Sequence, residues 1–162
     1  MSADLVRPAL VAPRDCLAYH DRQSVLLPRP LTPVEAWNRI MAAPLPGMGL
    51  AFRLRDAISA RFGVARIGGF SGRAVAPPQV GDRLDFFLVE SVAPDQLVLT
   101  ARDRHLDVMI SVDTRGSWLS ITASVVTHNR FGRVYMAPVA PAHRLIVWLM
   151  LKRLVRGLRA EA

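Results

Sequence analysis

The chain has 162 residues, 51% of them hydrophobic, which fits one globular domain with a core of its own. Its formal net charge of +8 suggests nucleic-acid binding, but the arginines are scattered from Arg7 to Arg159 and no nucleic-acid-binding motif stands out. We therefore expect no nucleic-acid partner.

The chain's one cysteine and its longest apolar run bear on where it acts. Cys16 is alone and cannot form an intramolecular disulfide, so a reducing compartment is expected. The N-terminal residues lack the apolar core of a secretory signal. The longest apolar run, 145–151, is far shorter than the ~20 residues needed to cross a bilayer. We expect a cytoplasmic protein without a transmembrane segment.

The first half predicts an arm, a strand and two helices. Residues 1–15 are expected to form an N-terminal arm, and 16–159 a single domain that begins with a strand ending near position 28. Thr32, Pro33 and Glu35 have the spacing of a capping box, so they predict a helix start, and Pro44 ends that helix. A second helix is expected over 48–62, followed by a Gly/Pro-rich connection over 68–82.

From Arg83 the apolar period changes from 3.6 to 2, which indicates strands. Four strands in series are predicted, over 83–91, 96–102, 105–114 and 117–129. Tight turns between them indicate an antiparallel meander. A last helix is expected from Pro141 to about Gly157. The predicted fold class is α+β, a curved antiparallel sheet with its helices on one side.

The last helix has an apolar first half and an amphipathic second half. One stripe is apolar, and four basic residues lie opposite it, but Leu145 and Leu149 fall on the basic side. Three interpretations fit: the chain's own fold wraps the first half, a second subunit covers it in a homodimer, or it touches a membrane surface. Wrapping by the chain itself is the simplest of the three.

Four segments carry a family resemblance. They are FRLRD (52–56), VGDRL (80–84), GSWLSIT (116–122) and THNRFGRVYMAPVAPAHRLIV (127–147). The chain resembles the uncharacterised bacterial domain-of-unknown-function family 2867. The order of its elements is similar to the helix-grip layout of the START-like superfamily (SRPBCC), which includes lipid-transfer domains and polyketide cyclases. The resemblance implies a cavity between the sheet and the long helix, and it supplies no catalytic residues.

The candidate ligand-binding residues cluster where the last strand meets the last helix. They are His128, Asn129, Arg130, Arg133, Tyr135 and His143, with Trp118 and Trp148 as apolar walls. One interpretation has their polar groups orienting the head of an apolar ligand. The other, which we favour, has them capping the helix and satisfying backbone groups. Gly132 is expected to have a positive φ in the intervening loop.

No catalytic or metal-binding motif is recognisable, and no cofactor is expected. His128 and His143 have no third ligand at suitable spacing. The preferred function is binding of a small, largely apolar molecule between sheet and helix. The alternatives are a cyclase- or isomerase-type enzyme in which His143 or Tyr135 moves a proton, and an interaction module that dimerises through the last helix.

Overall fold

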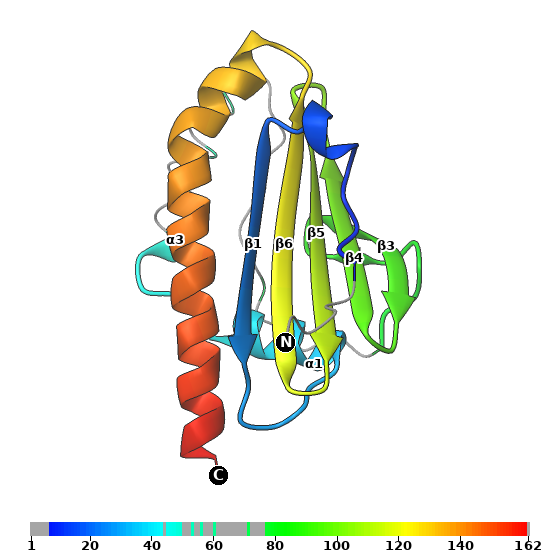
Figure 1. The fold of residues 1–162 in the computed structure, drawn as a ribbon. Coiled ribbons are helices and arrows are strands. Elements are labelled where there is room, and N and C mark those ends of the chain that lie inside the picture. The colour runs from blue at the N-terminus through cyan, green and yellow to red at the C-terminus, as the bar shows by residue number, and fades with distance from the viewer. Residues whose placement is uncertain are drawn as a thin grey trace.

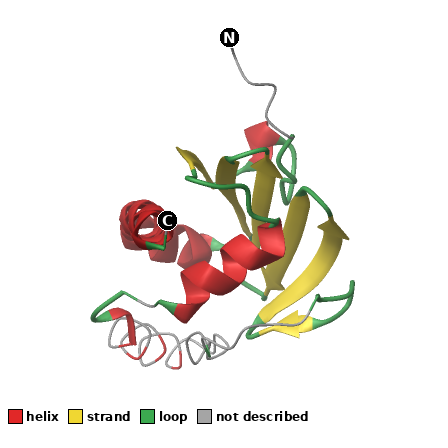
Figure 2. Ribbon diagram, turned by 90° about the horizontal axis from the view of Figure 1, so that it is seen from below, coloured by secondary structure: helices red, strands yellow, loops and turns green. Residues whose placement is uncertain are grey.

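A six-stranded antiparallel sheet forms the centre of the protein, with helices against one face (Figures 1 and 2). The computed structural model describes residues 7–43, 45–49, 53, 56, 60, 71 and 77–161. In the sheet the strands lie in the order β1-β6-β5-β4-β3-β2. They are β1 (Tyr19–Leu26), β2 (Arg83–Leu84), β3 (Phe87–Ala93), β4 (Gln96–Arg102), β5 (Leu106–Arg115) and β6 (Trp118–Thr127). The predicted α+β class is confirmed.

The helix α1 (Pro33–Ala42) begins as its sequence predicts. The Thr32 hydroxyl accepts a hydrogen bond from the backbone N–H of Glu35, and the Glu35 carboxylate accepts one from the backbone N–H of Thr32. This reciprocal pair satisfies two backbone donors that a helix start otherwise leaves open. The predicted second helix falls largely outside the described residues, although those described within it are helical: Met48, Gly49, Arg53, Asp56 and Ala60.

The strand expected over 83–91 is in fact a tight hairpin followed by a strand. Arg83 pairs with Leu88 and Leu84 with Phe87, so the chain reverses at Asp85. Asp85 has a φ of 56°, in the left-handed region that Asp tolerates better than most residues. The remaining strands of the meander pair as predicted, each with the next along the chain.

The long helix α3 (Arg130–Ala160) starts eleven residues earlier than Pro141, where its start was expected. Asn129 caps it, accepting a hydrogen bond from the backbone N–H of Gly132 at 3.0 Å. Pro138 and Pro141 therefore lie inside the helix, where each removes a backbone donor. Figure 1 shows the upper part of α3 bending over in this region, as internal prolines commonly cause.

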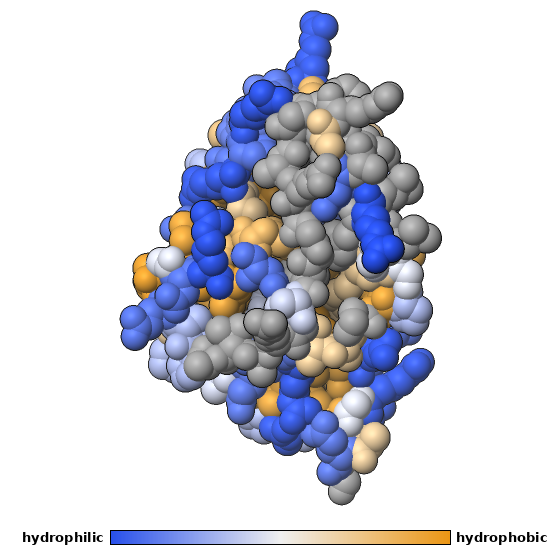
Figure 3. Space-filling model, turned by 180° about the vertical axis from the view of Figure 1, so that it is seen from behind, coloured by the Kyte–Doolittle hydropathy of each residue, from blue (hydrophilic) through white to orange (hydrophobic). Residues whose placement is uncertain are grey.

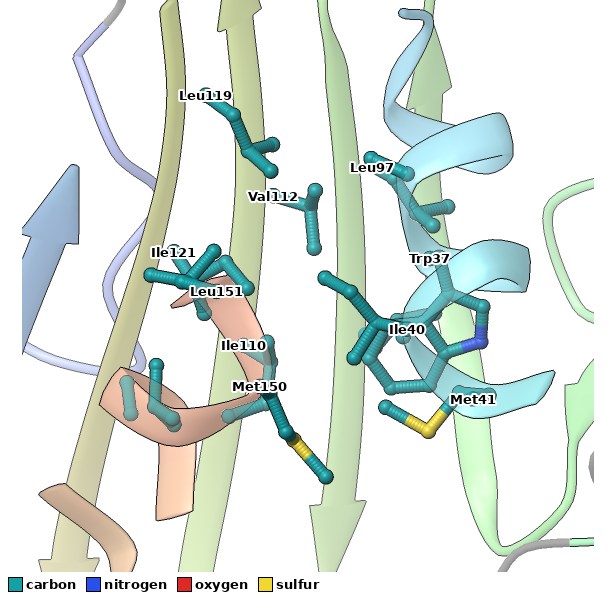
Figure 4. Close-up of a cluster of buried hydrophobic side chains, with 14 of the residues drawn as sticks. Trp37, Ile40, Met41, Leu97, Ile110, Val112, Leu119, Ile121, Met150 and Leu151 are labelled. Carbon is teal, nitrogen blue, oxygen red and sulfur yellow. The ribbon is translucent and has the colours of Figure 1, made fainter. Parts of the chain in front are cut away.

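The core lies between the sheet and the two helices. Trp37, Ile40 and Met41 of α1, with Met150 and Leu151 of α3, point onto the strands (Figure 4). The strand residues that meet them are Leu97, Ile110, Val112, Leu119 and Ile121. On the surface seen in Figure 3, hydrophobic residues appear in separate patches among hydrophilic ones.

The opposite face of the sheet carries hydroxyl groups and is covered by the N-terminal arm. Ser111, Thr122 and Ser124 on this face are fully buried. The backbone N–H groups of Ala9 and Val11 donate to the hydroxyls of Ser111 (3.3 Å) and Ser124 (3.0 Å). The arm runs in front of the sheet in Figure 1, while α1 lies behind it. The arm is therefore bound through its own backbone to side chains of the sheet.

Candidate functional site

The edge strand β1 presents three polar side chains to α3. Tyr19, Asp21 and Gln23 alternate along the strand, so they share the face that α3 packs against. The Gln23 amide donates to Asp21 Oδ2 at 2.8 Å and to the backbone carbonyl of Arg144 at 2.9 Å. These bonds join the strand directly to the middle of the helix.

Arg144 and His143 supply the helix side of this contact. Arg144 Nε donates to Asp21 Oδ1 at 3.1 Å, forming an ion pair. The ring of His143 meets that of Tyr19 edge to face with centroids 5.9 Å apart, and the Tyr19 hydroxyl lies 3.4 Å from His143 Nδ1. The cluster of Tyr19, Asp21, Gln23, His143 and Arg144, hereafter the β1–α3 cluster, is thus hydrogen-bonded throughout.

Burial shifts two of the groups in the β1–α3 cluster. It lowers the pKa of His143 below the usual value, and the negative charge of Asp21 opposes that shift only in part. Burial also raises the pKa of the Tyr19 hydroxyl, with the charge of Asp21 adding to the effect. His143 is therefore neutral at pH 7. His143 lies well inside α3 and not at a helix start, so burial rather than the helix terminus causes its shift.

An open groove of about 430 Å³ lies beside the β1–α3 cluster. One part of its wall is apolar, formed by Pro141, Leu145 and Trp148 of α3. Another part is polar, formed by Asp21, Gln23 and Arg144. The Lys152 ammonium lies 3.7 Å from the centre of the Trp148 ring, a cation–π contact. The groove thus combines an apolar wall with a few fixed polar groups, as small-molecule sites do.

The other candidates at the strand–helix junction have structural contacts. The Asn129 side chain caps α3 and donates to the carbonyl of Arg104 at 3.2 Å. His105 Nε2 accepts a hydrogen bond from Arg104 Nε at 3.0 Å, and Nδ1 of the same ring meets the Asn129 side-chain amide, 2.9 Å from its Nδ2 and 3.2 Å from its Oδ1. His128 Nε2 lies 3.2 Å from Asp107 Oδ1. The Asn129 contacts agree with the capping interpretation, whereas the His128 side chain contacts a carboxylate rather than a backbone group.

Aromatic stacking extends the junction along α3. The Phe131 ring lies between His105 (centroids 4.7 Å apart) and Tyr135 (6.2 Å). Arg130 and Arg133 are exposed on the first turn of the helix.

Gly132 does not have the positive φ expected of it; it lies within α3, packed against the backbone carbonyl of His105. A side chain at 132 would overlap that carbonyl, so close approach is what requires glycine here.

The predicted site residues thus divide into separate groups. His143 and Trp148 belong to the β1–α3 cluster and its groove, and the residues from His128 to Tyr135 lie at the start of α3. Trp118 starts β6, pairs with Leu26 and Arg115, and is 40% exposed. It does not line the groove with Trp148. Sequence reasoning missed Tyr19, Asp21 and Gln23, although their alternation along one strand was visible.

Two further properties concern metals and membranes. Among the described residues, no three His, Cys, Asp or Glu side chains gather as a metal site. Within the same residues, α3 is long and apolar enough, by length and composition alone, to cross a membrane. Of its 18 most apolar consecutive residues, 22% are buried inside the protein. The expectation of no transmembrane segment rested on apolar runs and remains a prediction.

Comparison with known proteins gives a family without an activity. A family model described as a protein of unknown function, DUF2867, matches residues 15–150. The chain belongs to this family, as its resemblance implied. No curated protein and no solved structure matches the chain.

Proposed function

We propose that the protein binds a small, largely apolar molecule in the groove between β1 and α3. The supporting observation is the pairing of an apolar wall, Pro141, Leu145 and Trp148, with the hydrogen-bonded Asp21, Gln23 and Arg144. A volume of about 430 Å³ lies within the range of small-molecule sites. Ligand binding of this kind agrees with the START-like relationship and the bacterial cytoplasmic location that we also propose.

The polar wall favours a ligand with an acidic or hydrogen-bond-accepting head. Asp21 is already engaged by both Gln23 and Arg144, so its charge is compensated. The Arg144 side chain is 62% exposed, donates to Asp21 through Nε and is also hydrogen-bonded to the Tyr19 hydroxyl. Since a guanidinium carries five N–H donors, its remaining donors can bind a carboxylate or sulfonate. The apolar body of the ligand would then lie along Leu145 and Trp148.

We place the ligand site in the groove rather than in the space between the sheet and the helices. Side chains of α1 and α3 fill the described part of that space, with Trp37 and Met150 lying over the central strands (Figure 4). A ligand there would have to displace core side chains, whereas the groove is open. The proposed site therefore lies at the sheet edge.

An enzyme of the cyclase or isomerase kind remains the second candidate because His143 is neutral at pH 7 and hydrogen-bonded to Tyr19. A neutral imidazole beside a ligand groove can act as a general base. Tyr135, the other proton-transfer candidate, precedes His143 by two turns, about 12 Å along the helix. The two would therefore not act on one atom.

The test uses two fluorescent probes that share an aromatic body. Anilinonaphthalene sulfonate carries an acidic head, and N-phenyl-1-naphthylamine does not. We expect Trp148→Ala to weaken both probes about tenfold, and Arg144→Met to weaken the sulfonate more than the neutral probe. Trp118→Ala is the matched control, because Trp118 (40%) and Trp148 (45%) are similarly exposed.

Equal losses in the two tryptophan variants would contradict the proposal, as would an Arg144→Met effect that is the same for both probes. Native mass spectrometry of protein purified from its source provides an independent readout. The expected result is a co-purified small molecule that is absent from the Trp148→Ala variant.

A further inference from the structure

One exposed stripe runs the length of α3 and changes from apolar to basic. Its members recur at spacings of three and four, and at 100° per residue they fall within an arc of about 80°. All are exposed. The exposed stripe consists of Val134, Pro138, Pro141, Leu145, Trp148, Lys152, Arg156 and Arg159.

The first five positions form an apolar surface that the chain itself leaves open. Val134 is 73% exposed and Leu145 55%, so the protein's own fold leaves this side of the helix uncovered. From Val134 to Trp148 the helix rises about 21 Å. Exposed apolar surface that is continuous along a helix marks a docking site more often than isolated leucines do.

The charged side chains of α3 itself all carry one sign. The segment 114–160 contains no Asp or Glu, whereas α3 carries seven basic residues. Arg144 forms an ion pair with Asp21, and Glu161 beyond the helix pairs with Arg29 and Arg39 of other elements. Within the described part of the chain, no ion pair involves the basic side chains in the last turns of α3. These side chains are Lys152, Arg153, Arg156 and Arg159.

This charge disfavours a second copy of the chain as the occupant. Antiparallel pairing that aligns the two apolar halves, 134–148, would bring Lys152 of one copy near Arg130 of the other. Parallel pairing would oppose Lys152 to itself. No carboxylate of α3 is available to relieve either repulsion. An anionic surface, in contrast, complements the basic half and accepts the apolar half.

We propose that α3 lies on the surface of a bilayer that contains anionic lipids, with its exposed stripe facing the lipid. Val134, Leu145 and Trp148 enter the boundary between headgroups and acyl chains, where tryptophan is favoured. Lys152 and Arg156 bind lipid phosphate. This inference does not rest on the groove holding a ligand, although Leu145 and Trp148 contribute to both surfaces.

The packing of α3 favours lying on the bilayer over crossing it. Its other face is buried in the core through Val147, Leu151, Leu154 and Leu158. Crossing would pull these residues off the sheet and break the Asp21–Arg144 ion pair inside hydrocarbon. A helix on the surface keeps every one of these contacts.

The experiment is sedimentation with vesicles of phosphatidylcholine alone or with 30% phosphatidylglycerol. We expect binding to the anionic vesicles only, weakening as salt rises from 0.1 to 0.5 M. Lys152→Ala/Arg156→Ala should weaken binding about 25-fold, since each basic residue near the surface contributes about fivefold. Lys152 contacts the groove residue Trp148, so the single variant Arg156→Ala separates the two sites. Arg156 does not line the groove, and its removal should weaken vesicle binding about fivefold and leave ligand binding unchanged.

Matched controls remove the same groups elsewhere. Arg83→Ala/Arg115→Ala lowers the charge equally on exposed strand positions and should cost much less affinity. Leu145→Ser should weaken binding, whereas Leu26→Ser, at a position 56% exposed on β1, should not. Equal losses in a variant and its control, or equal binding to both vesicles, would overturn the proposal. So would light scattering that shows a dimer which Leu145→Ser converts to a monomer.

Discussion

Gly132 of α3 packs so tightly against the backbone carbonyl of His105 that a β-carbon at 132 would overlap the oxygen. This contact joins the first turn of the long helix to the β4–β5 hairpin. The backbone N–H of His128 donates to the same carbonyl at 2.8 Å, so the carbonyl cannot shift freely.

Gly132→Ala should therefore destabilise the protein by about 1–3 kcal/mol, the usual range for an overpacked site. Gly157→Ala is the control, since Gly157 lies in the same helix with open space around its Cα. It should stabilise the protein by about 0.5–1 kcal/mol, because alanine loses less entropy in a helix. Urea unfolding measures both, and a Gly132→Ala variant as stable as wild type would refute the tight contact.

Asn129→Ala should lower the free energy of unfolding by about 1 kcal/mol. The substitution leaves the Gly132 N–H without its cap and removes the hydrogen bonds to His105 and Arg104. Asn129→Asp keeps the capping oxygen and should cost less. Thermal or chemical unfolding of the two variants compares them, and equal losses would show that the cap contributes little.

The N-terminal arm should loosen when its hydroxyl partners are removed. In the Ser111→Ala/Ser124→Ala variant the N–H groups of Ala9 and Val11 lose their acceptors. We expect faster tryptic cleavage after Arg14, whereas the Arg7–Pro8 bond resists trypsin in every variant. Ser24→Ala is the control, because Ser24 bonds to Ser120 rather than to the arm. Cleavage at the wild-type rate in the double variant would mean that other contacts bind the arm.

Stability should fall as the pH drops from about 7.5 towards 5, in part because of His143. Its pKa is below 6.5 in the folded protein, so the unfolded chain binds its proton more readily. The stabilisation is present above pH 6.5, the pKa of the unfolded chain, and is lost progressively as the pH falls from there through the lower pKa of the folded protein. His143→Gln should reduce this dependence in urea unfolding at several pH values. An NMR titration that finds His143 protonated at pH 7.5 would contradict the assignment.

Local signals in the sequence predicted much of the fold. The α1 start was predicted because its capping box spans only Thr32 to Glu35. The meander was predicted because strand alternation and turns repeat over a few residues, and β4 matches its expected range of 96–102.

The predicted start of α3 was wrong because Pro141, considered alone, resembles the first residue of a helix. What decides the start is Asn129, whose side chain caps the helix and also meets His105, 24 residues earlier. The contacts of Tyr19 and Asp21 with His143 and Arg144 likewise join residues more than 120 apart. Such contacts depend on the register of sheet and helix, which one sequence does not reveal.

The arm is bound through its backbone, and this affects which substitutions the protein tolerates. Because Ala9 and Val11 contribute their N–H groups, most side chains at these two positions preserve the hydrogen bonds. Proline alone lacks the donor and is excluded. Ser111 and Ser124 contribute their hydroxyls, so few replacements keep the bonds they make. Sequence drift should therefore be permitted along the arm and restricted on the strands beneath it.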